Sequence, residues 1–240
     1  MTKSLGVIGG LGPAATAYFY ELISRMTDAS IDQGHIDVNI ISRPSIPDRT
    51  DYILNKSADS PLPHLIEAGR ILEGLGVSYI AIPCITAHYF YDQLASNIGV
   101  PIIHIIRETV QYLKSHGVRK AGIMATEGTI TGELFQLELN KHGISPIIPT
   151  KPSQDLVTSL IYNNVKAGRP ANMEFFNKVR DELIRGGADT IILGCTELSM
   201  IKRDESIGSR FIDALEVLAM RSVLNSGASL KKEYQVLITS

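Results

Sequence analysis

The sequence predicts an α/β protein made of two similar lobes, each with a parallel sheet. Short apolar segments of strand length alternate along the chain with longer segments of helical period. Several of the helical segments end at a glycine directly before the next strand, which is typical of helix C-terminal stops. A weak internal repeat relates the two halves of the chain. These observations favour two Rossmann-like lobes related by a pseudo-two-fold axis, with a ligand site in the cleft between them.

The strands and helices follow from the apolar periodicity. Strands are expected at residues 5–8, 37–41, 79–82, 102–106, 121–124 and 190–193, each a short apolar run bounded by Gly or Pro. Helices are expected at residues 14–26, 62–75, 131–142, 155–165 and 173–185, where apolar residues recur three and four positions apart. The glycines expected to stop a helix are Gly76, Gly117, Gly143 and Gly187.

The internal repeat places the two cysteines at equivalent positions. In the first half, a strand beginning near Gly6 is followed later by a strand that ends at Cys84, and Gly122 and Cys195 hold the corresponding places in the second half. The first lobe is therefore expected to comprise residues 1–101 with 211–240, and the second lobe residues 102–210. Residues 211–224 are expected to form a helix that returns to the first lobe.

Composition excludes several classes of partner. The 240 residues are 44% hydrophobic, which allows a large buried core. Lys and Arg total 23 against 25 Asp and Glu, so no excess positive charge favours nucleic acid as a partner. No apolar run approaches the roughly 18–20 residues that span a bilayer, and the N-terminus lacks the apolar region of a signal peptide. A cytoplasmic protein with free thiols and no membrane partner is expected.

The two cysteines are the leading candidates for chemistry. Cys84 and Cys195 each follow an apolar strand, and ligand crevices open at the carboxyl ends of parallel strands. A single such cysteine is more often a packed apolar residue than a reactive one. Their equivalent positions, each at an expected helix N-terminus that lowers a thiol pKa, favour a paired role. Two facing thiols suit a reaction that removes a proton from one face of a carbon and delivers one to the other, as in racemisation at Cα.

Four motifs in order carry a resemblance that covers nearly the whole chain. Residues 5–16, 46–50, 83–88 and 194–198 read LGVIGGLGPAAT, IPDRT, PCITAH and GCTEL. They resemble the PLP-independent aspartate/glutamate racemase family. The resemblance implies an active site between the lobes, a small-molecule amino-acid substrate, no cofactor and a homodimer. It also implies a two-base mechanism in which one cysteine thiolate abstracts the α-proton and the other thiol donates.

The resemblance further implies roles for residues around the cysteines. Asp48 and Glu197 would assist the proton transfers of the cysteines as catalytic neighbours. Arg49 and Lys166 match the cationic pair of aspartate-specific members, where a guanidinium fork and an ammonium charge would bind the side-chain carboxylate. On their own, these two could equally be a surface arginine and a basic residue near a helix C-terminus. The remaining residues expected to bind substrate are Gly10, Leu11, Ile85, Thr86, Thr126, Tyr162 and Thr196.

One departure from the family pattern concerns substrate choice. Ile85 stands where the family usually has an Asn that binds the substrate. Losing one hydrogen bond to a charged group typically costs about 1.5–3 kcal/mol, which would weaken or alter substrate binding. Aspartate is the first expectation for the substrate. A racemase of glutamate or of broad specificity, an inactive descendant, and a non-catalytic small-ligand binding module remain alternatives.

Cofactor and metal motifs are weak. Residues 10–15 fit a G-x-G-x-x-A dinucleotide pattern, but the next expected strand ends at Arg43 without the acidic residue that binds a ribose. The turn is better suited to offering backbone N–H groups to a substrate carboxylate at a helix N-terminus. The cysteines lie too far apart in sequence for a zinc knuckle, and no His pair has metal-ligand spacing. No metal is expected.

Overall fold

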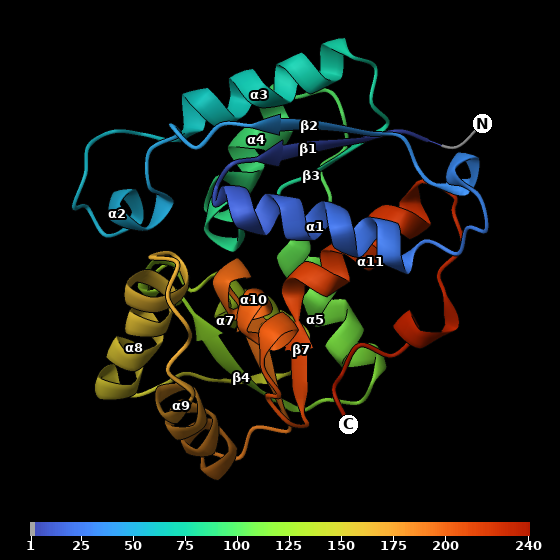
Figure 1. Ribbon diagram of the computed structural model, residues 1–240. Coiled ribbons are helices and arrows are strands. Elements are labelled where there is room, and N and C mark those ends of the chain that lie inside the picture. Colours follow the sequence, from blue (N-terminus) through green and yellow to red (C-terminus); the bar gives the residue numbers. More distant parts are fainter. Residues whose placement is uncertain (1–2) are drawn as a thin grey trace.

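The computed structural model describes residues 3–240 and contains two parallel sheets (Figure 1). The first sheet has the strand order β2-β1-β3 and the second the order β5-β4-β6-β7. All strand pairs within these sheets are parallel, which confirms the predicted α/β class with two lobes. The strands are β1 (Leu5–Gly9), β2 (Val38–Ser42), β3 (Tyr79–Ala81), β4 (Lys120–Ala125), β5 (Ser145–Ile147), β6 (Thr190–Gly194) and β7 (Phe211–Asp213).

Helices cover both sheets and fill the space between them (Figure 1). The α-helices are α1 (Pro13–Met26), α2 (Arg49–Ile53), α3 (Leu62–Gly74), α4 (Tyr91–Asn97), α5 (Ile105–Ser115), α6 (Glu127–Thr131), α7 (Leu134–Lys141), α8 (Lys151–Thr158), α9 (Met173–Arg185), α10 (Thr196–Asp204) and α11 (Ala214–Asn225). Short 3-10 helices occur at η1 (Asp32–Gly34), η2 (Ile85–Phe90) and η4 (Lys232–Tyr234), and η3 (Ser159–Val165) is a π-helix. Among residues 3–240, no helix has the length and apolar content needed to cross a membrane.

Three apolar clusters show where the core lies. The largest cluster joins α1, α5 and α11 and includes strand residues from both sheets, so it connects the two lobes. A second cluster packs α3 and α4 against the first sheet, and a third packs α8, α9 and α10 against the second sheet. The lobes are therefore joined by apolar burial between α1 and α11, which lie side by side in Figure 1.

Two predicted elements differ in the structure. Residues 102–106 do not form a strand: Ile102 makes one isolated bridge to Ile80, and α5 begins at Ile105. The His104 ring accepts a hydrogen bond from the Arg107 N–H at 3.4 Å and so caps this helix. A short run of isoleucines fits a strand and a buried helix equally well.

The segment 211–224 is not one helix. Phe211–Asp213 forms strand β7, which pairs with β6 in the second sheet, and only the rest forms α11. Three residues are too few to show a strand period, so the sequence did not separate the two elements. Residues 211–213 thus lie in the sheet of the second lobe, while α11 packs on α1 of the first. The wider division at residues 101 and 210 stays a prediction.

Other predicted boundaries shift by a few residues. The helix expected at 131–142 is two helices, α6 and α7, separated at Glu133, whose φ is 52°. The helix expected at 155–165 begins earlier, at Lys151, and continues as the π-helix η3. The four glycines expected to stop helices all have positive φ, between 71° and 94°, which confirms their role.

A buried carboxylate joins β7 to two helices. Asp213 is fully buried, and its Oδ1 accepts hydrogen bonds from the Ser199 hydroxyl at 2.7 Å and the Leu215 N–H at 2.9 Å. Its Oδ2 is buried without a hydrogen-bond partner. Burial, with the charge of Glu216 adding to it, raises the pKa of Asp213 from 3.8 to about 7, although Lys202 opposes this.

We expect Asp213→Asn to change how stability depends on pH. Between about pH 4 and pH 7 the folded chain holds a proton on Asp213 that the unfolded chain has released, so the free energy of unfolding falls as pH rises through this window. Asn keeps the Oδ1 acceptor but carries no charge. The variant should therefore melt at a higher temperature than the parent at about pH 8, and this advantage should vanish near pH 4. Thermal denaturation at both pH values checks this, and a variant less stable than the parent at about pH 8 would contradict it.

Candidate active site

A small, partly open cavity lies where the two lobes meet. Every residue predicted for the site lines it, with the exception of Gly10. We call it the inner cavity. Its lining residues are Leu11, Asp48, Arg49, Thr50, Cys84, Ile85, Thr86, Thr126, Thr129, Tyr162, Lys166, Gly194, Cys195, Thr196 and Glu197.

Cys84 enters the inner cavity from the first lobe. It follows β3 and forms the N-terminal cap position of the 3-10 helix η2. Its Sγ lies 3.3 Å from the Thr86 hydroxyl oxygen. The buried His88 ring fixes the backbone here, with Nδ1 3.0 Å from the Cys84 carbonyl oxygen. Burial lowers the pKa of His88 to about 4, so this ring is neutral and serves as a hydrogen-bonding support.

Cys195 enters the same cavity from the second lobe. It follows β6 and is the N-cap residue of α10. Its thiol donates a hydrogen bond to Oε2 of Glu197 at 2.9 Å, and the Thr196 hydroxyl donates to the same oxygen at 3.1 Å. Burial and the charge of Glu197 raise the pKa of the Cys195 thiol well above its usual value. This geometry holds Cys195 as a protonated thiol.

Asp48 and Arg49 reach the cavity from the start of α2. Oδ1 of Asp48 accepts the backbone N–H groups of Thr50 at 2.7 Å and Asp51 at 3.1 Å, so this carboxylate caps the helix. Arg49 is buried, and its terminal nitrogens donate to the carbonyl oxygens of Leu11 at 2.9 Å and Pro47 at 3.0 Å. These bonds hold the guanidinium at the cavity wall and tie α2 to the turn before α1.

The π-helix η3 supplies Tyr162 and leads into Lys166. Nζ of Lys166 lies 4.5 Å from the centroid of the Tyr162 ring, a cation–π distance. Lys166 is exposed and lines both the inner cavity and a wider one beside it, so its ammonium group lies at the boundary between them. Burial raises the pKa of Tyr162 to about 12, which keeps its hydroxyl protonated.

The wider cavity, here called the outer cavity, has a volume of about 450 Å³ and is lined in part by Gly10. Gly10 has a φ of 87°, and a Cβ at this position would lie 2.3 Å from the Arg43 backbone nitrogen. The residue is therefore required for the turn between β1 and α1. Leu11 lines both cavities. The sequence pattern correctly marked this turn, but it did not distinguish the inner from the outer cavity.

Two threonines at the start of α6 also line the inner cavity. Thr126 was predicted, and its hydroxyl accepts the Thr129 N–H at 3.2 Å as the cap of α6. Thr129 was missed, although its hydroxyl lies 3.1 Å from that of Thr126. The sequence motifs gave no signal that would have marked Thr129. Thr50 was missed as well.

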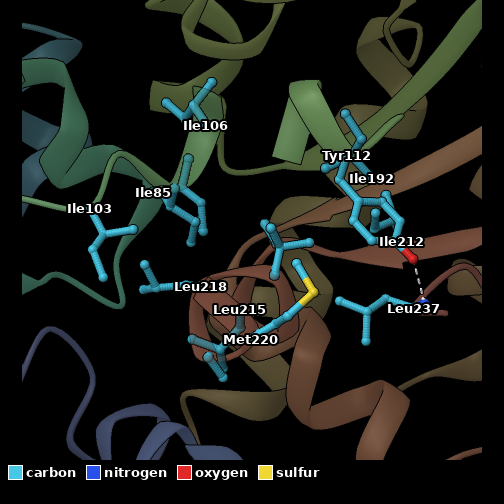
Figure 2. Close-up of a cluster of buried hydrophobic side chains, with 14 of the residues drawn as sticks. Ile85, Ile103, Ile106, Tyr112, Ile192, Ile212, Leu215, Leu218, Met220 and Leu237 are labelled. Atoms are coloured by element: carbon cyan, nitrogen blue, oxygen red, sulfur yellow. Dashed lines mark hydrogen bonds between the residues drawn. The ribbon is translucent and has the colours of Figure 1, made fainter. Parts of the chain in front are cut away.

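Ile85 belongs to the apolar core as well as to the cavity wall. Its side chain is 3% exposed and packs in the large cluster, near Ile103, Ile106 and Leu218 (Figure 2). The position that carries Asn in the family pattern is thus filled here by a side chain that extends the core between the lobes.

We expect Ile85→Asn to destabilise the fold by about 1–3 kcal/mol, because an amide would be buried among apolar side chains with few partners. The matched control is Ile85→Val, which keeps the apolar character and should cost only about 0.5–1.5 kcal/mol. Urea unfolding of both variants measures the difference. An Asn variant as stable as the Val variant would show that the position is open to polar groups.

The structure thus combines two parallel α/β sheets with two thiols that line one cavity between the lobes. A family model described as Asp/Glu/Hydantoin racemase matches residues 8–221, and the chain belongs to this family. The match confirms the resemblance inferred from the four motifs.

Individual relatives span nearly the whole chain. The chain is 28% identical over 229 residues to the broad specificity amino-acid racemase RacX of Bacillus subtilis, covering 91% of this chain and 96% of that protein. It is 30% identical to the structure of Picrophilus torridus aspartate racemase, with a TM-score of 0.85 over 97% of this chain and 98% of that chain. Glutamate racemase from Francisella tularensis shares the fold, with a TM-score of 0.63 at 17% identity over 93% and 81% of the two chains.

Proposed function

We propose that this chain racemises a free amino acid without a cofactor, with Cys84 and Cys195 as the two acid–base groups. The observation that carries the proposal is that the two thiols, one from each lobe, line a single cavity. A substrate bound between them would present opposite faces of its Cα to the two sulfur atoms. This arrangement suits proton removal on one face and proton delivery on the other.

The proton transfers balance between the two sulfur atoms. A thiolate on one side takes the Cα proton and becomes a thiol, while the thiol on the other side gives its proton to the opposite face of Cα and becomes a thiolate. The difficult step is forming the carbanion, since a thiolate is a weak base. The positive charges of Arg49 and Lys166 at the cavity wall would stabilise the negative charge that develops on the substrate.

Aspartate is the substrate that we propose first. Lys166 lies at the cavity boundary, where its ammonium group can reach a side-chain carboxylate, and Arg49 adds positive charge at the wall. The similarity to the Picrophilus torridus protein supports this choice. The chain is also similar to the broad specificity racemase of Bacillus subtilis, and it has the apolar side chain of Ile85 in the site. Other amino acids must therefore be tested beside aspartate. A homodimer and a cytoplasmic location remain predictions.

The test is loss of the Cα–H signal by proton NMR in D2O. Reduced protein is incubated with L-aspartate, L-glutamate and several neutral and basic L-amino acids, and chiral chromatography identifies the D-product. We expect aspartate to exchange and invert fastest. A chain that binds amino acids but exchanges none of them would overturn the proposal and favour a binding module. Fastest inversion of an uncharged amino acid would keep the reaction and overturn only the choice of aspartate.

A further inference from the structure

We propose that the outer cavity is a side-chain compartment of the same site, which binds the apolar end of amino acids whose side chains are longer than that of aspartate. The Cα of such an amino acid lies in the inner cavity, and its side chain extends past Lys166 into the outer cavity. This inference rests on the proposed racemase function and widens its substrate class from aspartate to amino acids with long apolar side chains.

The residues that line the two cavities fall into three groups. Cys84 and Cys195 line only the inner cavity. The residues that line both cavities are one apolar residue and four charged ones, namely Leu11, Asp48, Arg49, Lys166 and Glu197. Among residues 3–240, those that line only the outer cavity carry no polar side chain, and they include Pro13, Ala14, Ala15, Ile46, Val165 and Met200. A charged boundary therefore separates the two thiols from an apolar wall.

The free space in the two cavities is very different. The inner cavity has about 20 Å³, which is room for about one water molecule, whereas the outer cavity has about 450 Å³. Leu11 and Lys166 line both, so the two cavities adjoin at these residues. A substrate whose Cα lies between the two sulfur atoms therefore has room for a long side chain only in the outer cavity.

An apolar side chain can pass the charged boundary because the charged groups there already have partners or solvent. The terminal nitrogens of Arg49 donate to backbone carbonyl oxygens, and Oε2 of Glu197 accepts two hydrogen bonds within the site. Oδ1 of Asp48 accepts two backbone N–H groups as the cap of α2. Lys166 is exposed, so its ammonium group can stay in contact with water. Buried charges that keep their hydrogen bonds avoid the large cost of being left unpaired.

The experiment measures binding of a homologous series by isothermal titration calorimetry. The ligands are L-2-aminobutyrate, L-norvaline, L-norleucine and L-2-aminoheptanoate, which share one head group and differ by one methylene at each step. We expect the Kd to fall about three- to fourfold for each methylene beyond norvaline, since each added methylene is buried against the apolar wall. The heat capacity change of binding should become more negative at each step. A Kd that stays constant beyond norvaline would overturn the proposal.

Three variants test whether the outer cavity is the cause of this gain. Ala14 and Ala17 are both exposed on α1, but only Ala14 lines the outer cavity, so Ala17→Leu is the matched control for Ala14→Leu. The leucine at position 14 should fill space in the outer cavity and remove most of the gain per methylene. Met200→Gln keeps the side-chain length but makes this part of the wall polar, and it should also reduce the gain. Loss of the gain in either variant with Ala17→Leu unchanged supports the proposal, and a gain kept in both would overturn it.

Calorimetry requires no turnover, so its result is separate from the NMR test of racemisation. If aspartate is inverted but the Kd is constant along the series, the proposed function stands and the side-chain compartment is wrong. If the Kd falls along the series but no amino acid exchanges its Cα–H, the compartment stands as part of a binding site and the racemase function is wrong.

Discussion

Replacing either cysteine by alanine is expected to lower racemisation of the best substrate by about 10²–10⁴-fold, the usual contribution of a positioned acid or base. Each variant loses the group that serves one face of Cα, and the inner cavity contains no third thiol, since the chain has two cysteines. Chiral chromatography of the products over time measures this loss. A single-cysteine variant that keeps near-parental racemisation would contradict the two-thiol mechanism.

The two variants should differ in how fast they exchange the substrate Cα–H for deuterium from solvent, and this difference provides an internal control. In Cys195→Ala the remaining Cys84 can remove a Cα proton and return a deuteron from solvent to the same face, so one enantiomer should exchange without inverting. In Cys84→Ala the remaining thiol is the one whose pKa is raised by burial and Glu197, so exchange of the other enantiomer should be slower at neutral pH. NMR in D2O with each enantiomer supplied separately distinguishes the two cases. Unchanged thermal denaturation of both variants would show that the fold is intact.

Glu197→Gln is expected to lower turnover by about 10- to 100-fold. A hydrogen bond to a charged group contributes roughly 1.5–3 kcal/mol, and about 1.4 kcal/mol of barrier corresponds to a tenfold change in rate. The carboxylate accepts from both the Cys195 thiol and the Thr196 hydroxyl, and an amide would hold both more weakly. The charge of Glu197 is one of the causes that raise the pKa of Cys195, so removing it should lower this pKa. The alkaline limb of the rate profile should therefore move toward neutral pH.

The matched control for this variant is Glu67→Gln. Glu67 pairs with Arg43 at 2.9 Å on the surface, and its side chain is 58% exposed. This change should leave both turnover and the pH profile close to those of the parent, because surface ion pairs contribute little to the stability of the fold. Steady-state rates from about pH 6 to pH 10 for both variants make the comparison. An unchanged alkaline limb in Glu197→Gln would show that the carboxylate does not control Cys195.

The sequence predicted the parts of the site that depend on strand ends. Cys84 and Cys195 lie after buried strands, and parallel strands bring their carboxyl ends to one edge, so a shared cavity could be expected from the pattern alone. The bonds of Arg49 to the backbone carbonyls of Leu11 and Pro47 could not be predicted. They depend on how the loop before α2 folds against the turn before α1, and the apolar periodicity of the sequence does not predict such a contact.

The elements that were wrongly predicted share a physical cause. The strand β7 has three residues, and residues 102–106 are an apolar run that a helix cap at His104 converts into the start of α5. Both are cases in which tertiary context decides between two structures that the local pattern allows equally. Ile85 is similar: the motif identified the position as part of the site, but its membership of the core between the lobes became visible only in the structure.

The π-helix η3 makes the site sensitive to the number of residues that precede Lys166. An α-helix turns by about 100° per residue because it has 3.6 residues per turn, and a π-helix accommodates extra chain length by bonding five residues apart rather than four. Deleting one residue within Ser159–Val165 would let this segment relax into ordinary α-helix. Every side chain beyond the deletion would then be rotated relative to α8, and the ammonium group would leave the cavity boundary. In this segment, insertions and deletions should thus be tolerated less well than many substitutions, because the number of residues in η3 sets the direction in which the Lys166 side chain points.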